Sequence, residues 1–337
     1  MNYPLVAIVL PIRNEARYIA RCLEAVTAQD YPADKINVLA VDGLSSDETR
    51  SMLSDFASRD ARIRLLDNPK QITSTALNLG VSLSQSEVVI IVGGHTKITP
   101  NYVRLCIEAF GQSNADCVGG VIETVGETDM ARAIALAQSS PFGVGGARFR
   151  YSTRAEYVDT VAFGAYRREV FERIGLFDEE LVRNQDDEFN FRLTRAGGKI
   201  WLDPQIKSIY YSRGTLRRLW KQYYEYGFWK VRVIQKHGRP AALRHLVPVL
   251  FVGALGATLL LSLVTQNPLW FLLIFIPYAL AALGASVWSG LRSDWRIVPF
   301  LPIVFFVLHV SYGAGFLVGL IHWNLRVRTR AAMIKPS

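Results

Sequence analysis

Four short polar segments carry side chains that could bind a charged ligand. They are PIRNE at 11–15, VDGLSSD at 41–47, DNPKQ at 67–71 and GGHT at 93–96. Carboxylate, guanidinium and imidazole groups can hydrogen-bond to hydroxyls, ring nitrogens and phosphates. Each segment could also be a solvated loop, and only a fold that gathers all four makes them a site. The candidate binding residues are Pro11, Arg13, Asn14, Glu15, Asp42, Lys70, Gly94 and His95.

A second group of acidic residues lies much later in the chain. Asp186, Asp187 and Glu188 stand in the first turn of an expected helix, in which Phe189, Leu193 and Ala196 share one face. Acidic residues at a helix start complement the helix dipole, and this explanation stays open for Glu188. A carboxylate in this position can also take a proton from a reacting hydroxyl.

The elements that must position these residues alternate between strand and helix. Apolar runs at 5–12, 36–42, 63–68 and 87–94 predict strands, and helical spacing predicts helices over 14–29, 46–57 and 74–84. We expect Asn14 to cap the first helix and Ser45 or Ser46 the second. The alternation predicts an α/β fold, with a parallel sheet covered on both faces.

Ligands of such sheets bind at the carboxyl ends of the strands. That rule places all four polar segments on one edge of the sheet. No G-x-G-x-x-G follows the first strand, so a dinucleotide site is poorly supported, and no P-loop motif is present.

The chain after residue 115 is expected to differ. Segments 116–124 and 157–168 predict strands, and the glycine-rich segment 139–150, which carries Arg148 and Arg150, predicts a loop near the site. Residues 214–236 mix cations with aromatic side chains, which favours an amphipathic helix in a membrane interface. A core-packing helix with one solvated face remains the alternative.

The C-terminal part is apolar enough for a membrane. Residues 246–288 contain no Asp, Glu, Lys, Arg or His, and residues 297–323 contain only His309 and His322. A span needs about 20 apolar residues, so we expect helices at 246–264, 268–288 and 297–323. The chain is thus predicted to divide into a domain at 1–236 and a membrane domain at 237–337.

Charge supports a membrane location but leaves its topology open. Most cations outside the first domain flank the apolar runs, so the net charge of +9 indicates a membrane surface and not nucleic acid. Three complete spans would place the basic tail opposite the first domain, against the positive-inside rule, unless one segment is re-entrant or interfacial. The cysteines at 22, 106 and 117 show no paired spacing. We expect no secretory signal peptide, and a multi-pass protein of the inner cell membrane with its first domain in the cytoplasm.

These motifs together resemble the family 2 glycosyltransferases, which have the GT-A fold, a Rossmann-like nucleotide-diphospho-sugar transferase fold. The resemblance spans about residues 4–235 and is carried by VLPIRNEARYIARCLEAVTAQDYP, VDGLSSDET, ALNLGVSLSQSEVVIIV and IGLFDEELVRNQDDEFNFRLTRAGGKI. With SSPFGVGGARFR and the apolar C-terminal runs, the chain looks most like the ExoA-type succinoglycan glucosyltransferases.

The resemblance implies roles for the two groups of residues. The first strand tip and Asp42 would bind the base and ribose of a nucleotide sugar, and Lys70 could approach the nucleotide. The general base of the family is an aspartate six positions before the Arg of an RL pair. Counting back from Arg192 gives Asp186, and Asp187 is the alternative if the register shifts by one.

One motif of the family is missing. Members normally end the fourth strand with Asp-x-Asp, which binds Mg²⁺ or Mn²⁺ against the diphosphate, and this chain has Gly93, Gly94 and His95 there. His95 could ligate a metal as neutral imidazole. Cations such as Lys97, Arg148 or Arg150 could also stabilise the leaving diphosphate.

The resemblance therefore predicts an inverting, membrane-anchored hexosyltransferase. It would move glucose from UDP-glucose to a polyprenyl-linked saccharide during exopolysaccharide or other surface glycan synthesis. Two alternatives stay open. One is a polyprenyl-phosphate glycosyltransferase, and the other is an inactive scaffold subunit that only binds nucleotide sugars, which the missing Asp-x-Asp would explain.

Overall fold

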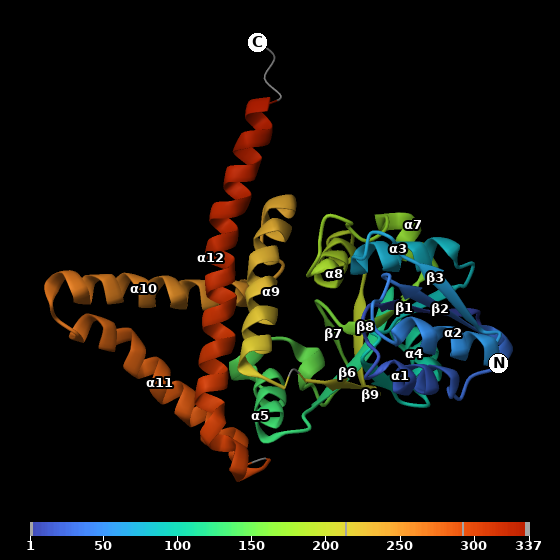
Figure 1. The fold of residues 1–337 in the computed structure, drawn as a ribbon, viewed down its shortest axis with the longest axis horizontal. Helices are drawn as coiled ribbons and strands as arrows, with labels where there is room; N and C mark the ends of the chain where they lie inside the picture. Colours follow the sequence, from blue (N-terminus) through green and yellow to red (C-terminus); the bar gives the residue numbers. More distant parts are fainter. Residues whose placement is uncertain (1–2, 213, 292, 334–337) are drawn as a thin grey trace. The chain divides into compact units, whose positions relative to one another are not determined.

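A curled mixed sheet is the framework of the N-terminal part. The computed structural model describes residues 3–212, 214–291 and 293–333. Within them nine strands form one sheet, in the order β3-β2-β1-β4-β8-β6-β9-β5, with β7 paired to β9 (Figure 1). The strands are β1 Val6–Ile12, β2 Ile36–Asp42, β3 Ile63–Asp67, β4 Val88–Ile91, β5 Thr96–Ile98, β6 Cys117–Val125, β7 Glu156–Val158, β8 Ala162–Arg167 and β9 Ile200–Tyr211.

The first four strands form the expected parallel layer. β1 pairs in parallel with β2 and β4, and β2 pairs in parallel with β3. The ends of β1, β2 and β3 are level, because Ile12 is opposite Asp42 and Asp42 is opposite Asp67. The remaining pairs, β4–β8, β6–β8, β5–β9 and β7–β9, are antiparallel.

Two helical layers bury the faces of this sheet. Alternate side chains of β1 enter opposite cores, with Ile8 and Leu10 in one and Ala7 and Val9 in the other. The first core takes side chains from α1 Ile19–Thr27, α2 Thr49–Arg59 and α4 Tyr102–Ser113. The second takes them from α3 Thr73–Leu83, α7 Arg168–Ile174 and α8 Gln185–Arg195.

Two helices begin later than the sequence pattern predicts. α1 starts at Ile19 and not at Asn14, because Asn14 has φ 53°, in the left-handed region. α2 starts at Thr49, and Glu48 occupies its N-cap position instead of Ser45 or Ser46. Both predictions were wrong because the side chains expected to cap the helices form bonds between two loops instead.

The middle of the chain also departs from expectation. Segment 157–168 forms two strands, β7 and β8, with a break at 159–161. The segment expected to be a loop contains a short helix, α6 Pro141–Val144, in which the hydroxyl of Ser140 accepts a hydrogen bond from the N–H of Gly143. The helix was not predicted because the many glycines of the segment favour a loop. Ser140 as the N-cap, followed by a proline, is nevertheless a helix-start signal.

A second compact unit combines residues 124–146 with residues 212–337, and the first combines residues 1–123 with 147–211. The second unit contains α5 Asp129–Gln138, α6, α9 Leu216–His237, α10 Val247–Thr265, α11 Leu269–Gly290 and α12 Leu301–Met333. Short 3-10 helices lie at Ala33–Lys35, Arg148–Arg150, Leu243–His245 and Trp295–Phe300 (η4). Three segments, Leu243–Thr265, Leu269–Gly290 and Trp295–Leu325, are long and apolar enough to cross a membrane.

Candidate active site

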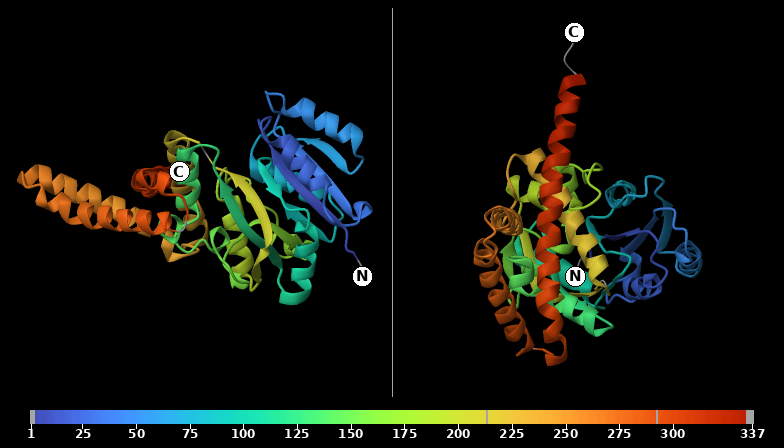
Figure 2. Two further views of the ribbon diagram at one scale, coloured as in Figure 1. Left: turned by 90° about the horizontal axis from the view of Figure 1, so that it is seen from below. Right: turned by 60° about the vertical axis from the view of Figure 1, so that its left-hand side comes forward.

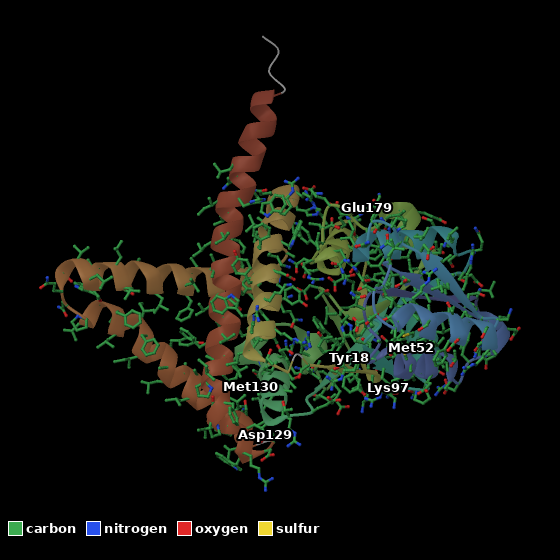
Figure 3. All side chains as sticks on the ribbon, viewed as in Figure 1. Tyr18, Met52, Lys97, Asp129, Met130 and Glu179 are labelled. Carbon is green, nitrogen blue, oxygen red and sulfur yellow. The ribbon has the colours of Figure 1, made fainter. Side chains whose placement is uncertain are left out.

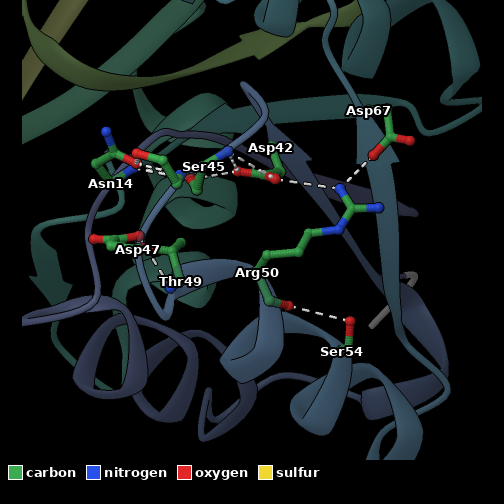
Figure 4. A network of polar contacts seen from close by, with 9 residues as sticks. Asn14, Asp42, Ser45, Asp47, Thr49, Arg50, Ser54 and Asp67 are labelled. Carbon is green, nitrogen blue, oxygen red and sulfur yellow. Dashed lines mark hydrogen bonds and ion pairs between the residues drawn. The ribbon is translucent and has the colours of Figure 1, made fainter.

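Asp42 lies fully buried at the end of β2. Its Oδ1 accepts a hydrogen bond from the hydroxyl of Ser45 at 2.6 Å. Its Oδ2 accepts one from Nη1 of Arg50 at 3.2 Å (Figure 4). A buried carboxylate requires partners of this kind. Ser45 and Arg50 therefore hold the strand-end carboxylate in place.

Arg50, which no sequence motif singles out, connects two strand ends. The same Nη1 also binds the carboxylate of Asp67, at the end of β3. Hydrogen bonding to Asp67, and then to Asp42, raises the pKa of Arg50. Its position in α2, eight residues after Asp42, gave no signal, because an arginine on an exposed helical face is ordinary.

Asn14 and Asp47 join the first two polar loops. The N–H of Asn14 donates to the hydroxyl of Ser45 at 2.9 Å, and its Oδ1 accepts from the N–H of Ser46 at 2.8 Å. Burial would raise the pKa of Asp47, but hydrogen bonds from Thr49 and from the N–H of Ala16 outweigh it and lower that pKa. Figure 4 shows Asn14, Asp47 and Thr49 beside Asp42.

Glu15 links the first loop to the end of β4. Its N–H donates to the hydroxyl of Thr49 at 2.8 Å, and its Oε1 lies 2.9 Å from Nδ1 of His95. A Cβ atom at Gly94 would lie 3.3 Å from Cγ of Glu15, so the glycine leaves room for this side chain. When Nδ1 donates to a carboxylate, Nε2 is the ring atom available to a ligand.

Tyr210 brings Arg150 to the same region. The ring of His95 packs edge-on against Tyr210, with centroids 5.1 Å apart. Cζ of Arg150 lies 5.8 Å from the centroid of Tyr210. Arg148 pairs instead with Glu156 at 3.5 Å. Of the two arginines, only Arg150 shares a packing partner with His95.

Lys70 binds the loop that precedes α8. Its ammonium lies 2.6 Å from a carboxylate oxygen of Glu179, and this hydrogen bond, with one from Asn78, lowers the pKa of Glu179. Figure 3 labels Glu179 close to α7 and α8. Both partners are substantially exposed, so the pair adds little stability. Its structural effect is to connect the loop after β3 with the loop before α8.

The three acids at the start of α8 differ in environment. Glu188 is buried and pairs with Arg192 at 2.7 Å. Arg192 also donates to the carbonyl of Leu176 at 2.7 Å, which ties α8 to the loop before it. Asp186 is exposed and Asp187 half-buried, and the N–H of Asp187 donates to Oδ1 of Asp186 at 2.9 Å. Glu188 is thus a structural residue, and Asp186 and Asp187 are accessible to a ligand.

Asn190 anchors this helix beside the end of β4. Its amide donates to the hydroxyl of Thr160 at 2.9 Å and to the carbonyl of Val161 at 3.4 Å. These residues lead directly into β8, which runs antiparallel to β4. A Cβ atom at Gly93 would lie 3.4 Å from the ring of Phe163 in β8. The first turns of α8 and the Gly93–His95 segment therefore both adjoin the start of β8.

The described residues hold no group of three or more His, Cys, Asp or Glu side chains that could bind a metal ion. His95 is arranged so that it could be the only protein ligand of a metal ion. A metal-binding histidine commonly donates its other ring N–H to a carboxylate, as Nδ1 of His95 can to Glu15. Mg²⁺ usually takes few protein ligands and completes its shell with phosphate oxygens and water. Carboxylate oxygens suit Mg²⁺ and Mn²⁺ better than imidazole does, so among the described residues His95 offers one nitrogen ligand and an ion here would depend mainly on phosphate oxygens.

Comparison with known proteins gives the site its context. Residues 7–175 match the model of the family described as glycosyl transferase family 2. The chain is 31% identical to the succinoglycan biosynthesis protein ExoA of Rhizobium meliloti (strain 1021), over 95% of this chain and 96% of that protein. It is 29% identical, over 96% of this chain and 99% of the relative, to the dolichyl N-acetyl-alpha-D-glucosaminyl phosphate 3-beta-D-2,3-diacetamido-2,3-dideoxy-beta-D-glucuronosyltransferase of Methanococcus voltae.

Solved structures show the same fold. The mannosyltransferase PcManGT from Pyrobaculum calidifontis, in complex with GDP-Man and Mn²⁺, superposes with a TM-score of 0.57 at 18% identity, covering 93% of this chain and 88% of that one. TarS residues 1–349 from S. aureus, in complex with UDP, has a TM-score of 0.50 at 15% identity, covering 93% and 90%. The predicted GT-A-like fold is confirmed. The chain belongs to glycosyl transferase family 2 and is a glycosyltransferase.

Proposed function

We propose that the protein transfers a hexose, glucose from UDP-glucose, to a polyprenyl-linked saccharide at the cytoplasmic face of the cell membrane. The product would enter exopolysaccharide or another surface glycan. The observation that carries this proposal is one edge of the sheet, at which a buried carboxylate, a histidine–glutamate pair and an arginine adjoin a helix that begins with two accessible acids. Relatives named for succinoglycan synthesis and for a dolichyl-linked sugar acceptor support the pathway and the acceptor class.

The nucleotide would bind along the ends of β1, β2 and β3. Asp42 offers carboxylate oxygens to a base N–H or a ribose hydroxyl, in exchange for one of its internal donors. Pro11, Arg13 and Asn14 form the adjacent strand end, and the side chain of Arg13 packs over Gly43. Lys70 supplies a cation at the end of β3. In this proposal the diphosphate would lie toward Gly94 and His95.

Sugar transfer requires a base for the acceptor hydroxyl. Asp186 would accept that proton as the hydroxyl oxygen attacks the anomeric carbon and the bond to the diphosphate breaks. The attack comes from the face opposite the leaving group, so the configuration inverts. Arg150, together with Arg148 two residues before it, would stabilise the negative charge of the leaving diphosphate.

Replacing Asp186 tests the proposed base. Asp186→Asn keeps the shape but removes the proton acceptor, so we expect kcat to fall by about 10²–10⁴-fold, with the KM for UDP-glucose little changed. Asp187→Asn is the matched comparison and should retain most of the activity. Purified protein would be assayed with a membrane lipid extract as acceptor source. Loss in Asp187→Asn with activity kept in Asp186→Asn would transfer the role to Asp187.

A divalent ion is part of the proposal. Nε2 of His95 would hold Mg²⁺ or Mn²⁺ beside the diphosphate. Such an ion neutralises charge on the leaving group. Glu15 would hold the His95 ring in the ligating orientation through the hydrogen bond to Nδ1.

Calorimetric titration with UDP measures this role without turnover. We expect Mn²⁺ to tighten UDP binding to the native protein, and His95→Gln to abolish the gain. Glu15→Gln should weaken metal-supported binding by about 10–100-fold, because the ring loses its orienting partner. Lys207→Gln, an exposed cation of β9 to which no site role is assigned, is the control and should keep the gain. Equal UDP affinity in EDTA and in Mn²⁺ would remove the ion from the proposal.

Transfer directly to polyprenyl phosphate is the rival within the same class. A phosphate acceptor already carries negative charge and needs less help from a base. The Asp186→Asn variant separates the two, because it should stop transfer to a sugar hydroxyl but spare transfer to a phosphate.

A further inference from the structure

The three apolar segments of the second unit differ in how much of their surface the protein covers. We compared the most apolar stretch of each segment. None of its residues is buried in Leu243–Thr265, 11% are buried in Leu269–Gly290, and 44% are buried in Trp295–Leu325. A helix in lipid exposes apolar side chains around most of its surface. The first two segments fit that description, whereas nearly half of the third is packed inside the protein.

Helix α11 has the features of a complete crossing. Trp270 and Trp288 are both strongly exposed and lie near its two ends. They are separated by about 27 Å along a helix, close to the roughly 30 Å of bilayer hydrocarbon. Tryptophan is enriched at both membrane interfaces. The turn from α10 to α11, Gln266–Pro268, carries no charge, so the pair can insert as a hairpin.

Helix α12 packs along the charged helix α9. A Cβ atom at Gly227 would lie 2.0 Å from the carbonyl oxygen of Tyr312, and one at Gly315 would lie 2.1 Å from that of Tyr224. Further on, the amide of Gln235 donates to Asn324 at 3.1 Å. From the Tyr224–Gly315 contact to the Gln235–Asn324 contact, both helices run in the same direction. The glycines allow close parallel packing over the second half of α12.

The composition of α9 excludes it from the hydrocarbon layer. Between Leu216 and His237 it carries six Lys or Arg residues and one Glu. A charged side chain at the bilayer centre is costly. If α12 crossed the membrane, α9 would accompany half of it, and Arg232, whose guanidinium lies 5.5 Å from the ring of Trp323, would be carried along.

The pair suits the surface of a membrane. On α12, Val318, Ile321 and Leu325 are exposed at intervals of three and four residues, which places them on one face. Arg217, Arg218 and Lys221 of α9 are exposed, together with Trp220. An apolar stripe, as on α12, and cations with a tryptophan, as on α9, are each found on helices that lie at the headgroup level.

The orientation of the hairpin agrees with this arrangement. In the left view of Figure 2, α12 is seen nearly end-on, and in Figure 1 α10 runs across the direction of α12 while α11 slants toward the lower end of α12. α12 therefore crosses the direction of the hairpin. When the hairpin lies along the membrane normal, α12 lies closer to the membrane plane.

We propose that only α10 and α11 cross the membrane, and that α12 lies with α9 against the lipid headgroups, on the side that holds residues 1–211. Two crossings place the basic C-terminal tail on that same side. This removes the conflict between three spans and the positive-inside rule. The lipid surface is thus the partner of the α9–α12 pair.

Single-cysteine labelling in intact cells tests the proposal, because the native thiols of Cys22, Cys106 and Cys117 are buried. The probes are Thr265→Cys at the hairpin turn, Ser337→Cys at the C-terminus and Ser58→Cys on α2. A maleimide that does not cross membranes should label only Thr265→Cys, and all three after permeabilisation.

The other outcomes are distinct. Labelling of Thr265→Cys together with Ser337→Cys would show three crossings and overturn the proposal. Protection of all three would show that the hairpin does not cross and would overturn it as well. Labelling of Ser58→Cys together with Ser337→Cys, but not Thr265→Cys, would support the two-crossing arrangement and contradict the cytoplasmic placement in the proposed function.

Discussion

At the scale of single residues, the site is built from bonds between loops. Asn14 and Glu15 each bind a partner from another loop, and Asp42 binds Ser45 of its own loop and Arg50 of α2, so the polar segments support one another before any ligand is considered. Because Asp42 is fully buried and Asp67 is exposed, the two carboxylates on Arg50 should contribute very differently to stability.

Replacing the two carboxylates measures that difference. Asp42→Asn leaves a buried amide beside Ser45 and Arg50, and we expect a loss of about 1–3 kcal/mol. Asp67→Asn, on the same arginine but exposed, should cost less than about 1 kcal/mol. Thermal unfolding in detergent gives the comparison. Equal shifts in the two variants would show that burial of Asp42 does not determine its contribution.

At the scale of elements, local patterns were sufficient for strands and helices but not for their ends. The parallel strands, the helix at α8 and the apolar C-terminal helices were predicted because their periodicity is local. The start of α1 was not, because Asn14 bonds to Ser46, which is far along the chain. Tyr210 and Arg50 were missed for a related reason. Their importance comes from pairing between distant segments, such as Thr96 with Tyr210, that no local pattern encodes.

The contact between α9 and α12 gives a prediction at this scale. Alanine in place of glycine normally stabilises a helix by about 0.5–1 kcal/mol. Gly227→Ala should instead destabilise the second unit, because its Cβ would lie 2.0 Å from the Tyr312 oxygen. Gly256→Ala in α10, with nothing within 4 Å, is the matched control and should be neutral or stabilising. Protease resistance in detergent compares them, and equal resistance would show that the helices do not pack this closely.

At the scale of the whole molecule, the chain forms two compact units with different contents. The first contains the strand ends and α8, and the second contains the apolar helices. Length and hydropathy were enough to predict the apolar helices. They could not show that residues 124–146 pack with them, since α5 carries no sequence signal for that contact beyond its small apolar residues.

Anchoring by the hairpin predicts how the protein resists extraction. Alkaline carbonate, which releases surface-bound proteins, should leave the chain in the membrane pellet. Leu280→Lys, an exposed residue near the centre of α11, should increase its release, because a lysine there costs about 2.5–3.5 kcal/mol. Leu83→Lys, an exposed residue of α3, is the control and should change nothing. Full release of the native protein would contradict membrane insertion.

The bonds of Asp42 have a consequence for affinity. A nucleotide that reaches this carboxylate meets oxygens to which Ser45 and Arg50 are already bound, so it must displace an intramolecular competitor. The free energy that the nucleotide gains by bonding to Asp42 is therefore partly offset by the loss of the bond from Ser45 or Arg50. Weakening the competitor, for example by Arg50→Gln, would then tighten nucleotide binding even as it loosened the fold.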